Sequence, residues 1–403
     1  MIKQTQTKMF DFSDTDLDFC GGSKNKFPTV FKKMLAQGYN SKVVSSVLVT
    51  GDQITLDYGV NHGYVAGRVL VINTPGLDGE FYIDSVSSNT LTITVQNAPA
   101  SIDGGFTTKV APLGYELVYE NAHIHIYKFK HIDETDLYLR LCFQTVLTQR
   151  NSVIAAIGKS VDLNLGIITD VNSPGDLGTC PTVSDSTFGL RWDFDGEAYA
   201  GRNNFSYLGG FSSLGKGCVV GSQYHLLFLG SYGNNTAYNY VYGFLPTHSF
   251  ANKEELNYPA LITTNISTPA SSINTAYISS ARVYVGKTRA VFSGGSSSIA
   301  TFMSSPVAAS SFLPKSLEDF NTTAAIPLSL YEVSTKQFLG MIIGGLFAIC
   351  YGTSNQPSSA VGVIPEETID IDFNTKIMRH TFGGDSNTRV FVAAPIEEIK
   401  IVS

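Results

Sequence analysis

The chain has 403 residues, a length that suggests two to three domains, and a formal net charge of −7 with neutral histidines. Hydrophobic residues make up 43% and charged residues only 15%, which excludes an intrinsically disordered chain. The acidic balance argues against nucleic-acid binding through a basic surface. Neutral polar side chains cost less to bury in a subunit interface than charges do. The composition therefore hints at assembly, although an ordinary β-rich protein fits it equally well.

The N-terminal region, residues 1–44, predicts an arm followed by one short helix. Residues 1–26 are polar and irregular, so we expect an N-terminal arm that lacks a core of its own and becomes ordered on a neighbouring protein. They contain no apolar run of the kind found in signal peptides. The helix is expected over about 28–37, because Pro28 suits a first helical turn and Gly38 suits a C-terminal cap.

Residues 45–112 predict a small β module. Apolar and polar residues alternate with a period of two in consecutive short runs, which is the pattern of half-buried strands. The separating segments TGDQ, TPGLDG and SSNT carry turn signals. Among them, Asp78-Gly79 can adopt the positive φ values of a tight hairpin turn.

Residues 113–262 predict a β-sandwich-like domain with long loops. The alternating segments 122–132 and 136–147 are joined by a short link and should form one hairpin. A second hairpin is expected over 224–245. The intervening residues 170–215 are rich in Gly, Asp, Asn and Ser, which is typical of loops.

Residues 263–403 predict a C-terminal β region, with a domain boundary near the Ser-, Thr-, Asn- and Pro-rich stretch 263–280. Its apolar run 338–351 has 14 residues, which is too short to span a bilayer. We interpret it as two buried strands that meet at Gly344-Gly345. The fold class is therefore mostly β, with β-sandwich-like domains, a small inserted β module and one or few short helices.

Five cysteines occur in the chain, an odd number with wide spacing that does not form a disulfide framework. They predict free thiols in a reducing compartment. They stand at Cys20, Cys142, Cys180, Cys218 and Cys350.

Three histidines, His123, His125 and His131, lie on one face of the strand expected over 122–132. Two imidazoles at this spacing can approach one ion, so a structural metal is one interpretation. The other is an aromatic strand face packed in an interface, with the histidines satisfied by hydrogen bonds. The pattern favours the second, and we expect neither a metal nor another cofactor.

The segment Trp192-Asp193-Phe194-Asp195-Gly196-Glu197 places three carboxylates on one side of an extended chain. It is too short for a calcium loop. Two facing carboxylates beside a tryptophan could serve glycoside hydrolysis, but a polar turn explains the pattern better.

Two segments come close to a phosphate-binding loop. Gly210 to Lys216 has the spacing but is followed by Gly217, which offers no hydroxyl for a metal ion. Gly286-Lys287-Thr288 lacks the first glycine, and the residues before it favour a strand. Neither precedes a helical pattern, and no GxSxG motif is present. We therefore expect no catalytic residues and no enzyme.

Residues 61–95 resemble a small β module that is common in virion proteins of tailed bacteriophages. The match consists of a His-Gly opening, a glycine before a Val-rich strand, an Asp-Gly-x-Phe-Tyr strand and a final Thr-rich strand. The run 326–347 also resembles C-terminal regions of phage tail and baseplate proteins. The matching residues are His62-Gly63, Gly67, Asp78-Gly79, Phe81-Tyr82, Ser85-Val86 and Thr90-Leu91-Thr92-Ile93.

The resemblance implies a structural component of a tailed-phage virion, in the tail or baseplate, assembled in the host cytoplasm. Expected partners are copies of itself, in a ring or another homo-oligomer, and other tail, baseplate or neck proteins. No nucleic acid and no membrane span are expected. One alternative is a receptor-binding tail fibre or tip protein whose loops over 170–215 contact a host glycan, although no fibrous repeat is visible. A further alternative is a glycan-degrading enzyme that uses Asp193 or Asp195.

Overall fold

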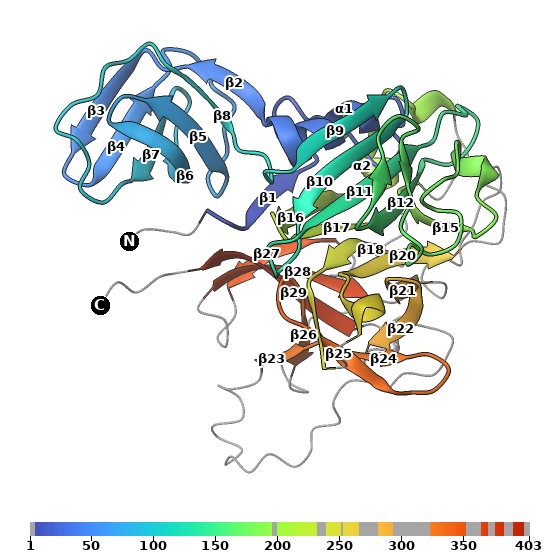
Figure 1. Cartoon of the computed structure of the whole chain (residues 1–403). Helices are drawn as coiled ribbons and strands as arrows, with labels where there is room; N and C mark the ends of the chain where they lie inside the picture. The colour runs from blue at the N-terminus through green and yellow to red at the C-terminus, as the bar shows by residue number, and fades with distance from the viewer. Residues whose placement is uncertain are drawn as a thin grey trace.

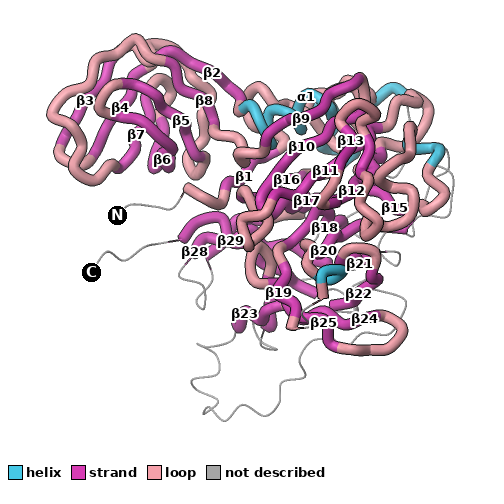
Figure 2. Tube along the Cα trace, in the orientation of Figure 1, coloured by secondary structure: helices cyan, strands magenta, loops and turns pink. Residues whose placement is uncertain are grey.

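The structure, a computed structural model, describes residues 5–195, 200–231, 239–250, 253–265, 281–292, 323–351, 364–369, 375–382 and 390–398. Antiparallel strands dominate it, and its described part contains two short α-helices, α1 (Phe27–Lys32) and α2 (Tyr207–Leu214) (Figure 1, Figure 2). This confirms the predicted fold class, mostly β and sandwich-like with few short helices. A small module projects from a larger body (Figure 1).

Seven strands form the module, in the spatial order β2-β8-β5-β6-β7-β4-β3. They span residues 39–110, near the predicted 45–112. Alternate residues point into a common apolar interior, as the period-two pattern predicts. The strands are β2 (Tyr39–Val43), β3 (Ser46–Thr50), β4 (Gln53–Asp57), β5 (Val69–Thr74), β6 (Leu77–Val86), β7 (Thr90–Thr94) and β8 (Thr107–Val110).

The tight turn of the module lies elsewhere than predicted. Thr74 pairs with Leu77, so the hairpin between β5 and β6 turns over Pro75-Gly76, and Gly76 has φ +82°. Proline followed by a glycine at positive φ suits a two-residue turn. Asp78 and Gly79, the predicted turn residues, belong to β6 itself.

The body has three sheet layers (Figure 1). The first contains β9 to β12 and β15, and its hairpin β10–β11 confirms the predicted pairing of 122–132 with 136–147. A two-stranded ribbon, β13 (Val161–Asp162) with β14 (Ile167–Ile168), lies beside it. The layer's strands are β9 (Glu116–Asn121), β10 (Ile124–Lys130), β11 (Asp136–Phe143), β12 (Ser152–Gly158) and β15 (Leu190–Asp193).

The middle layer continues from the first through the pairing of β15 with β20. Its β17–β18 pair confirms the second predicted hairpin. Every residue of β16, β17 and β18 is buried, since the sheet is covered on both faces. The layer contains β1 (Lys8–Asp11), β16 (Gly217–Ser222), β17 (His225–Ser231), β18 (Asn239–Leu245), β19 (Thr247–Ser249), β20 (Ala260–Asn265), β21 (Ala281–Val285), β22 (Thr288–Phe292), β24 (Ser329–Glu332) and β25 (Phe338–Ile342).

The third layer is a five-stranded sheet from the C-terminal part of the chain. The chain contributes β23 to this sheet, passes through β24 and β25 of the middle layer, and returns at Gly344-Gly345, between β25 and β26, where two strands were predicted to meet; Gly345 has φ +84°. Its strands are β23 (Thr323–Pro327), β26 (Phe347–Tyr351), β27 (Glu366–Ile369), β28 (Thr375–Phe382) and β29 (Val390–Glu398).

The predicted boundary between residues 262 and 263 does not separate two sheets. β20 and β21 flank the stretch 263–280 and pair with each other, so the middle layer runs across it. Residues 266–280 of that stretch lie outside the described residues. The composition marked a polar connection between neighbouring strands of one sheet, and the first strand of the C-terminal sheet is β23, further along the chain.

The first apolar interior lies between the first and middle layers and contains α1. Together with the π-helical turn η1 (Lys33–Gln37), α1 covers the predicted helix over 28–37. Phe31 stacks on Phe228 of β17, with ring centroids 4.8 Å apart, and meets Phe143 of β11 edge-on at 5.2 Å. The helix thus joins both layers, since aromatic pairs of this geometry add to the burial energy.

The predicted long loops of 170–215 are interrupted by short elements. β15 and α2 lie within this range, together with the 3₁₀ turns η2 (Val183–Asp185) and η3 (Ala200–Arg202); a further turn, η4 (Glu254–Leu256), follows β19. The sequence did not predict α2, because its Gly-Gly and Ser-Ser pairs have a low helix propensity.

Residues 5–26 do not form an arm without a core, contrary to the prediction. β1 pairs with β16 and extends the middle layer. Phe10, Phe12 and Phe19 are fully enclosed in the first interior. The strand is four residues long and its sheet partner lies about two hundred residues away in sequence, so local pattern did not reveal it.

Two buried histidines predict a loss of stability in mild acid. Burial lowers the pKa of His225 and of His380 to about 4, whereas the unfolded value is about 6.5. Between these values the unfolded chain binds protons that the folded chain does not, so stability falls as the pH falls, by at most about 3 kcal/mol for each histidine.

The measurement is the thermal unfolding midpoint between pH 7.5 and 4.5, for the wild type and for His380→Gln. The Nε2 atom of His380 lies 3.1 Å from the carbonyl oxygen of Gly230 in β17. We expect a shallower pH dependence in the variant, while the same substitution at the exposed His248 leaves the slope unchanged. Equal slopes in all three proteins would contradict the assignment.

Candidate functional site

The three histidines considered as metal ligands have separate partners. His123 Nε2 lies 2.8 Å from the carbonyl oxygen of Pro181, and His125 Nδ1 lies 3.0 Å from the Tyr127 hydroxyl. His131 Nδ1 lies 3.0 Å from a carboxylate oxygen of Asp133. Within the described ranges, no group of three or more His, Cys, Asp and Glu side chains could hold a metal ion.

The acidic segment after Trp192 is packed inside the body. Trp192 is fully buried and donates from Nε1 to the carbonyl of Ile262, at 2.9 Å. Asp193 accepts a hydrogen bond from Ser152, and burial raises the pKa of Asp193 although Arg150 opposes the shift. Asp195 is also buried, and Glu197 lies outside the described residues. Because Trp192, Asp193 and Asp195 are buried, these three side chains do not present an open sugar-binding face.

The two segments that resembled phosphate-binding loops adopt other structures. Gly210 lies within α2 and Gly215 follows its last residue with φ +72°, so the segment forms the C-terminal end of a helix instead of preceding one. Gly286 and Lys287 form the turn of the β21–β22 hairpin, in which Val285 pairs with Thr288. The four cysteines whose side chains are described, Cys20, Cys142, Cys180 and Cys218, are free thiols and buried.

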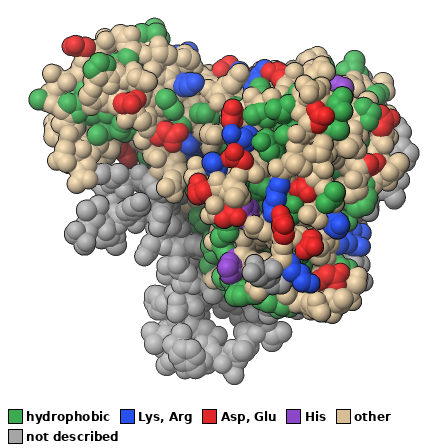
Figure 3. Space-filling model, in the orientation of Figure 1, with side chains coloured by type: hydrophobic (Ala, Val, Ile, Leu, Met, Phe, Trp, Pro, Cys, Tyr) green, Lys and Arg blue, Asp and Glu red, His purple; other side chains and the backbone are tan. Residues whose placement is uncertain are grey.

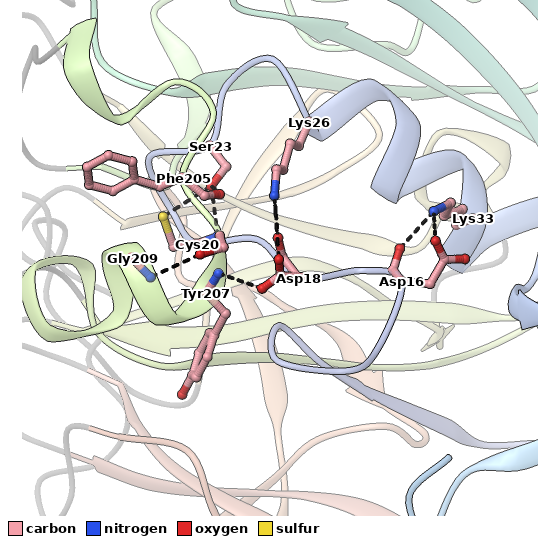
Figure 4. Close-up of polar contacts among 10 residues, drawn as sticks. Asp16, Asp18, Cys20, Ser23, Lys26, Lys33, Phe205, Tyr207 and Gly209 are labelled. Atoms are coloured by element: carbon pink, nitrogen blue, oxygen red, sulfur yellow. Dashed lines mark hydrogen bonds and ion pairs between the residues drawn. The ribbon is translucent and has the colours of Figure 1, made fainter. Parts of the chain in front are cut away.

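Polar side chains converge instead at the N-terminal segment, residues 11–26, which we call the junction segment. It lies where the module meets the body (Figure 1). Figure 4 shows it beside α1 and α2, with its aspartates and lysines paired across short distances. The segment contacts elements that are far apart in sequence, and its charged side chains include the buried Asp14 and Lys24.

The link from the junction segment to the module is an ion pair between Asp14 and Arg68. Nε and Nη2 of Arg68 donate to the two carboxylate oxygens of Asp14 at 2.7 and 2.8 Å, and both side chains are buried. Tyr39, at the start of β2, donates its hydroxyl to the same carboxylate at 2.6 Å. The two-pronged geometry fixes the orientation of the partners as well as their distance.

Electrostatics within this group keep both charges in place. Burial acts to lower the pKa of Arg68, but the Asp14 carboxylate outweighs it, so this pKa lies above the ordinary value. Burial and the adjacent carboxylate raise the pKa of Tyr39 well above its usual range. Arg68 therefore stays charged and Tyr39 stays a hydrogen-bond donor at physiological pH.

A second link to the module runs through Asp16 and Asn40. One Asp16 oxygen accepts from Lys33 Nζ at 2.7 Å and the other from the backbone N–H of Asn40 at 3.0 Å. The Asn40 side chain donates to the carbonyl of His62 at 3.0 Å, and Asn40 has φ +52°. Asparagine tolerates this left-handed backbone better than most residues, so the bend into β2 is held from both sides.

The link to α2 is a capping interaction. Asp18 accepts from the backbone N–H of Tyr207, the first residue of the helix, at 2.9 Å, and Lys26 lies 3.8 Å from the Asp18 carboxylate (Figure 4). Ser23 donates to the carbonyl of Phe205 at 2.7 Å. A carboxylate at a helix N-terminus binds otherwise unpaired N–H groups.

The link to the first layer is the buried amine of Lys24. Its Nζ donates to the carbonyls of Val146 and Leu147, at 2.9 and 3.1 Å, and to that of Gln149. Burial lowers the pKa of Lys24 to about 8, against the opposing charge of Asp195. The three carbonyls lie in the loop between β11 and β12, so one ammonium group holds this loop to the junction segment.

The arrangement can hold rigid parts of the chain in fixed positions relative to one another. His62, one of the residues of the phage-module resemblance, has a similar holding role: its Nδ1 accepts from the N–H of Tyr64 and its Nε2 lies 3.1 Å from the carbonyl of Thr90. The sequence did not single out the junction residues. The one signal in the sequence that could have indicated them is the density of aspartates in the run DFSDTDLD. In the structure these aspartates contact residues that are distant in sequence.

A scan of protein-family models gives no match, and a search of curated proteins gives no significant match. Among the described residues, no helix has the length and apolar character needed to cross a membrane.

Breaking the Asp14–Arg68 pair from one side should destabilise the protein strongly. Asp14→Asn leaves a buried guanidinium without its counter-charge, and Arg68→Met leaves a buried carboxylate, so each single variant should lose about 3–5 kcal/mol. The double variant should lose less than the sum, because no unpaired buried charge remains. Urea unfolding of the four proteins checks this, and strict additivity would contradict it. The exposed pair Lys32–Glu120 is the control, with an expected loss below about 1 kcal/mol for Lys32→Met.

Removing the Lys24 ammonium should loosen the loop between β11 and β12. Lys24 is 3% exposed, and Lys24→Met leaves three carbonyls without this donor, so we expect a loss of about 2 kcal/mol. Hydrogen exchange should also rise at residues 145–150. Lys26→Met is the matched control, because Lys26 is 31% exposed and binds a single backbone carbonyl. Equal protection in the wild type and Lys24→Met would show that the ammonium does not hold the loop.

Proposed function

We propose that the chain is a structural component of a tailed-phage virion, in the tail or baseplate, that acts by assembly with copies of itself and with neighbouring virion proteins. The single observation that carries the proposal is the resemblance of residues 61–95 to the β module of phage virion proteins. These residues contribute β5, β6 and β7 to the projecting module. A small domain held away from the body has room to contact neighbours on several sides.

The character of the surface supports an assembly role. Only 15% of the residues are charged, and uncharged side chains and backbone cover most of the face seen in Figure 3, where charged side chains occur singly or in small groups. Neutral polar surface can be buried between subunits with a smaller desolvation cost than charge. The buried contacts of the junction segment hold the module in one orientation on the body, which suits a protein that is built into an assembly.

Tail or baseplate assembly also fits the way in which the module is attached. A flexible linker would let the module sample many orientations. Here the buried Asp14–Arg68 pair, the Asp16–Asn40 contact and an ion pair between Lys8 and Glu80, at 3.0 Å, join module and body. A module oriented in this way presents the same surface in every copy, which symmetric assembly requires.

Immunogold electron microscopy of virus particles from the source lysate tests this proposal. Antibodies raised against the purified chain should label one end of the tail, and pre-incubation with the same chain should abolish the label. Label at the neck or capsid would contradict the tail or baseplate assignment. Particles without label, in a preparation that labels with an antibody to a known tail protein, would overturn the virion role itself.

A further inference from the structure

The strand β3 forms an open edge of the module. It is the last strand of the seven-stranded sheet and pairs with β4, and in Figure 1 it lies at the outer end of the module, away from the body. Its sequence, Ser-Val-Leu-Val-Thr, has no charge and no proline. Leu48 at its centre is 64% exposed.

Other edge strands of the described structure carry features that discourage pairing with another chain. Proteins protect edges with charges, proline, bulges or shortness. β1, β2, β9 and β27 contain Lys, Glu or Asp, β23 ends in proline, and β13, β14 and β19 have two or three residues. β3 is five residues long and has none of these features along 46–50, which sets it apart from the rest.

The backbone of β3 offers a defined set of hydrogen-bonding groups. Thr50 pairs with Gln53 across the two-residue turn Gly51-Asp52, so the backbone groups of these two residues form hydrogen bonds with each other. In an antiparallel pair every second residue bonds to the neighbouring strand, so the backbone N–H and C=O groups of Leu48 also point toward β4. The N–H and C=O groups of Val47 and Val49 consequently point to the open edge. Their side chains pack on the interior of the module.

We propose that β3 pairs antiparallel with β3 of a second copy of this chain, centred on Leu48. In this register Leu48 lies opposite the partner's Leu48, Val47 opposite the partner's Val49, and Ser46 opposite the partner's Thr50. Apolar residues meet apolar residues, hydroxyls meet hydroxyls, and no charge is buried. A neutral, palindromic pattern of this kind is self-complementary, as a two-fold interface requires. The inference deepens the proposed assembly role and rests on it.

The pairing should be weak in dilute solution. Four backbone hydrogen bonds and one leucine pair bury far less than the roughly 1,200 Å² of a standard interface. Copies that are held side by side in an assembly have a high effective concentration, and there the same contact closes readily. The test therefore needs a readout that captures a transient dimer.

Disulfide trapping with the Leu48→Cys variant of the full chain supplies that readout. Leu48 and the partner's Leu48 form a non-hydrogen-bonded pair, whose Cα atoms are about 4.5 Å apart, within the range that a disulfide spans. With oxidised glutathione as the oxidant, which leaves as two reduced glutathiones, dimer should form at least roughly tenfold faster than for Ser85→Cys, because pairing raises the effective concentration of the thiols. Ser85 is exposed on β6 of the same module.

Charge variants test the register. Leu48→Lys and Leu48→Glu each place like charges opposite each other and should lower the self-association seen by sedimentation at high concentration, whereas an equal mixture should restore it. Val49→Pro removes an N–H that points outward and leaves the bonds to β4 intact, so it should abolish association, and its unfolding midpoint checks that the module still folds.

Equal trapping rates for Leu48→Cys and Ser85→Cys, or no restoration in the Lys and Glu mixture, would overturn the β3–β3 pairing. Tail-end gold label together with that result would leave the virion role in place and reject this contact alone. Trapping by Leu48→Cys with particles that lack label would instead retain the contact and reject the virion role.

Discussion

Burial of the middle sheet on both faces is the constraint on which the rest of the structure depends. A sheet covered twice must be apolar along whole strands, and β16 to β18 are. Val219 and Phe228 face the first interior, while Val220 and Leu227 face the second. Such a sheet cannot leave its β16 edge in water, and β1 covers it. The N-terminal segment is therefore part of the fold.

Once β1 is in place, the residues that follow it must return between module and body, and their charges need partners there. Burying a carboxylate such as Asp14 is tolerable only when a counter-charge and hydrogen-bond donors surround it. Arg68 and Tyr39 supply them from the module. Lys24 is accommodated in the same way by backbone carbonyls of the first layer. Each buried charge thus ties the segment to a different part of the chain.

Local patterns predicted what depends on neighbours in sequence and missed what depends on distant partners. The β10–β11 hairpin follows from alternation in 122–147, and the helix at 27–37 follows from Pro28 and Gly38. β1 pairs with β16, about two hundred residues later in the sequence, and is only four residues long, so its sequence pattern is too short to predict this pairing. The junction aspartates looked like a solvated polar run, because nothing in DFSDTDLD indicates that Arg68, Asn40 and the N-terminus of α2 lie beside it.

The contrast between edges connects the fold to its use. β1 satisfies one edge from within the chain, and charges such as Glu116 and Glu120 on β9 or Glu366 on β27 keep other edges in solvent. A chain that protects its other edges in so many ways leaves Ser46–Thr50 without charge or proline, at the outer end of the module (Figure 1). Because the module is held rigidly by buried charge, that edge has one direction relative to the body. Because its orientation is fixed, this edge strand can make the same contact in every copy of the chain.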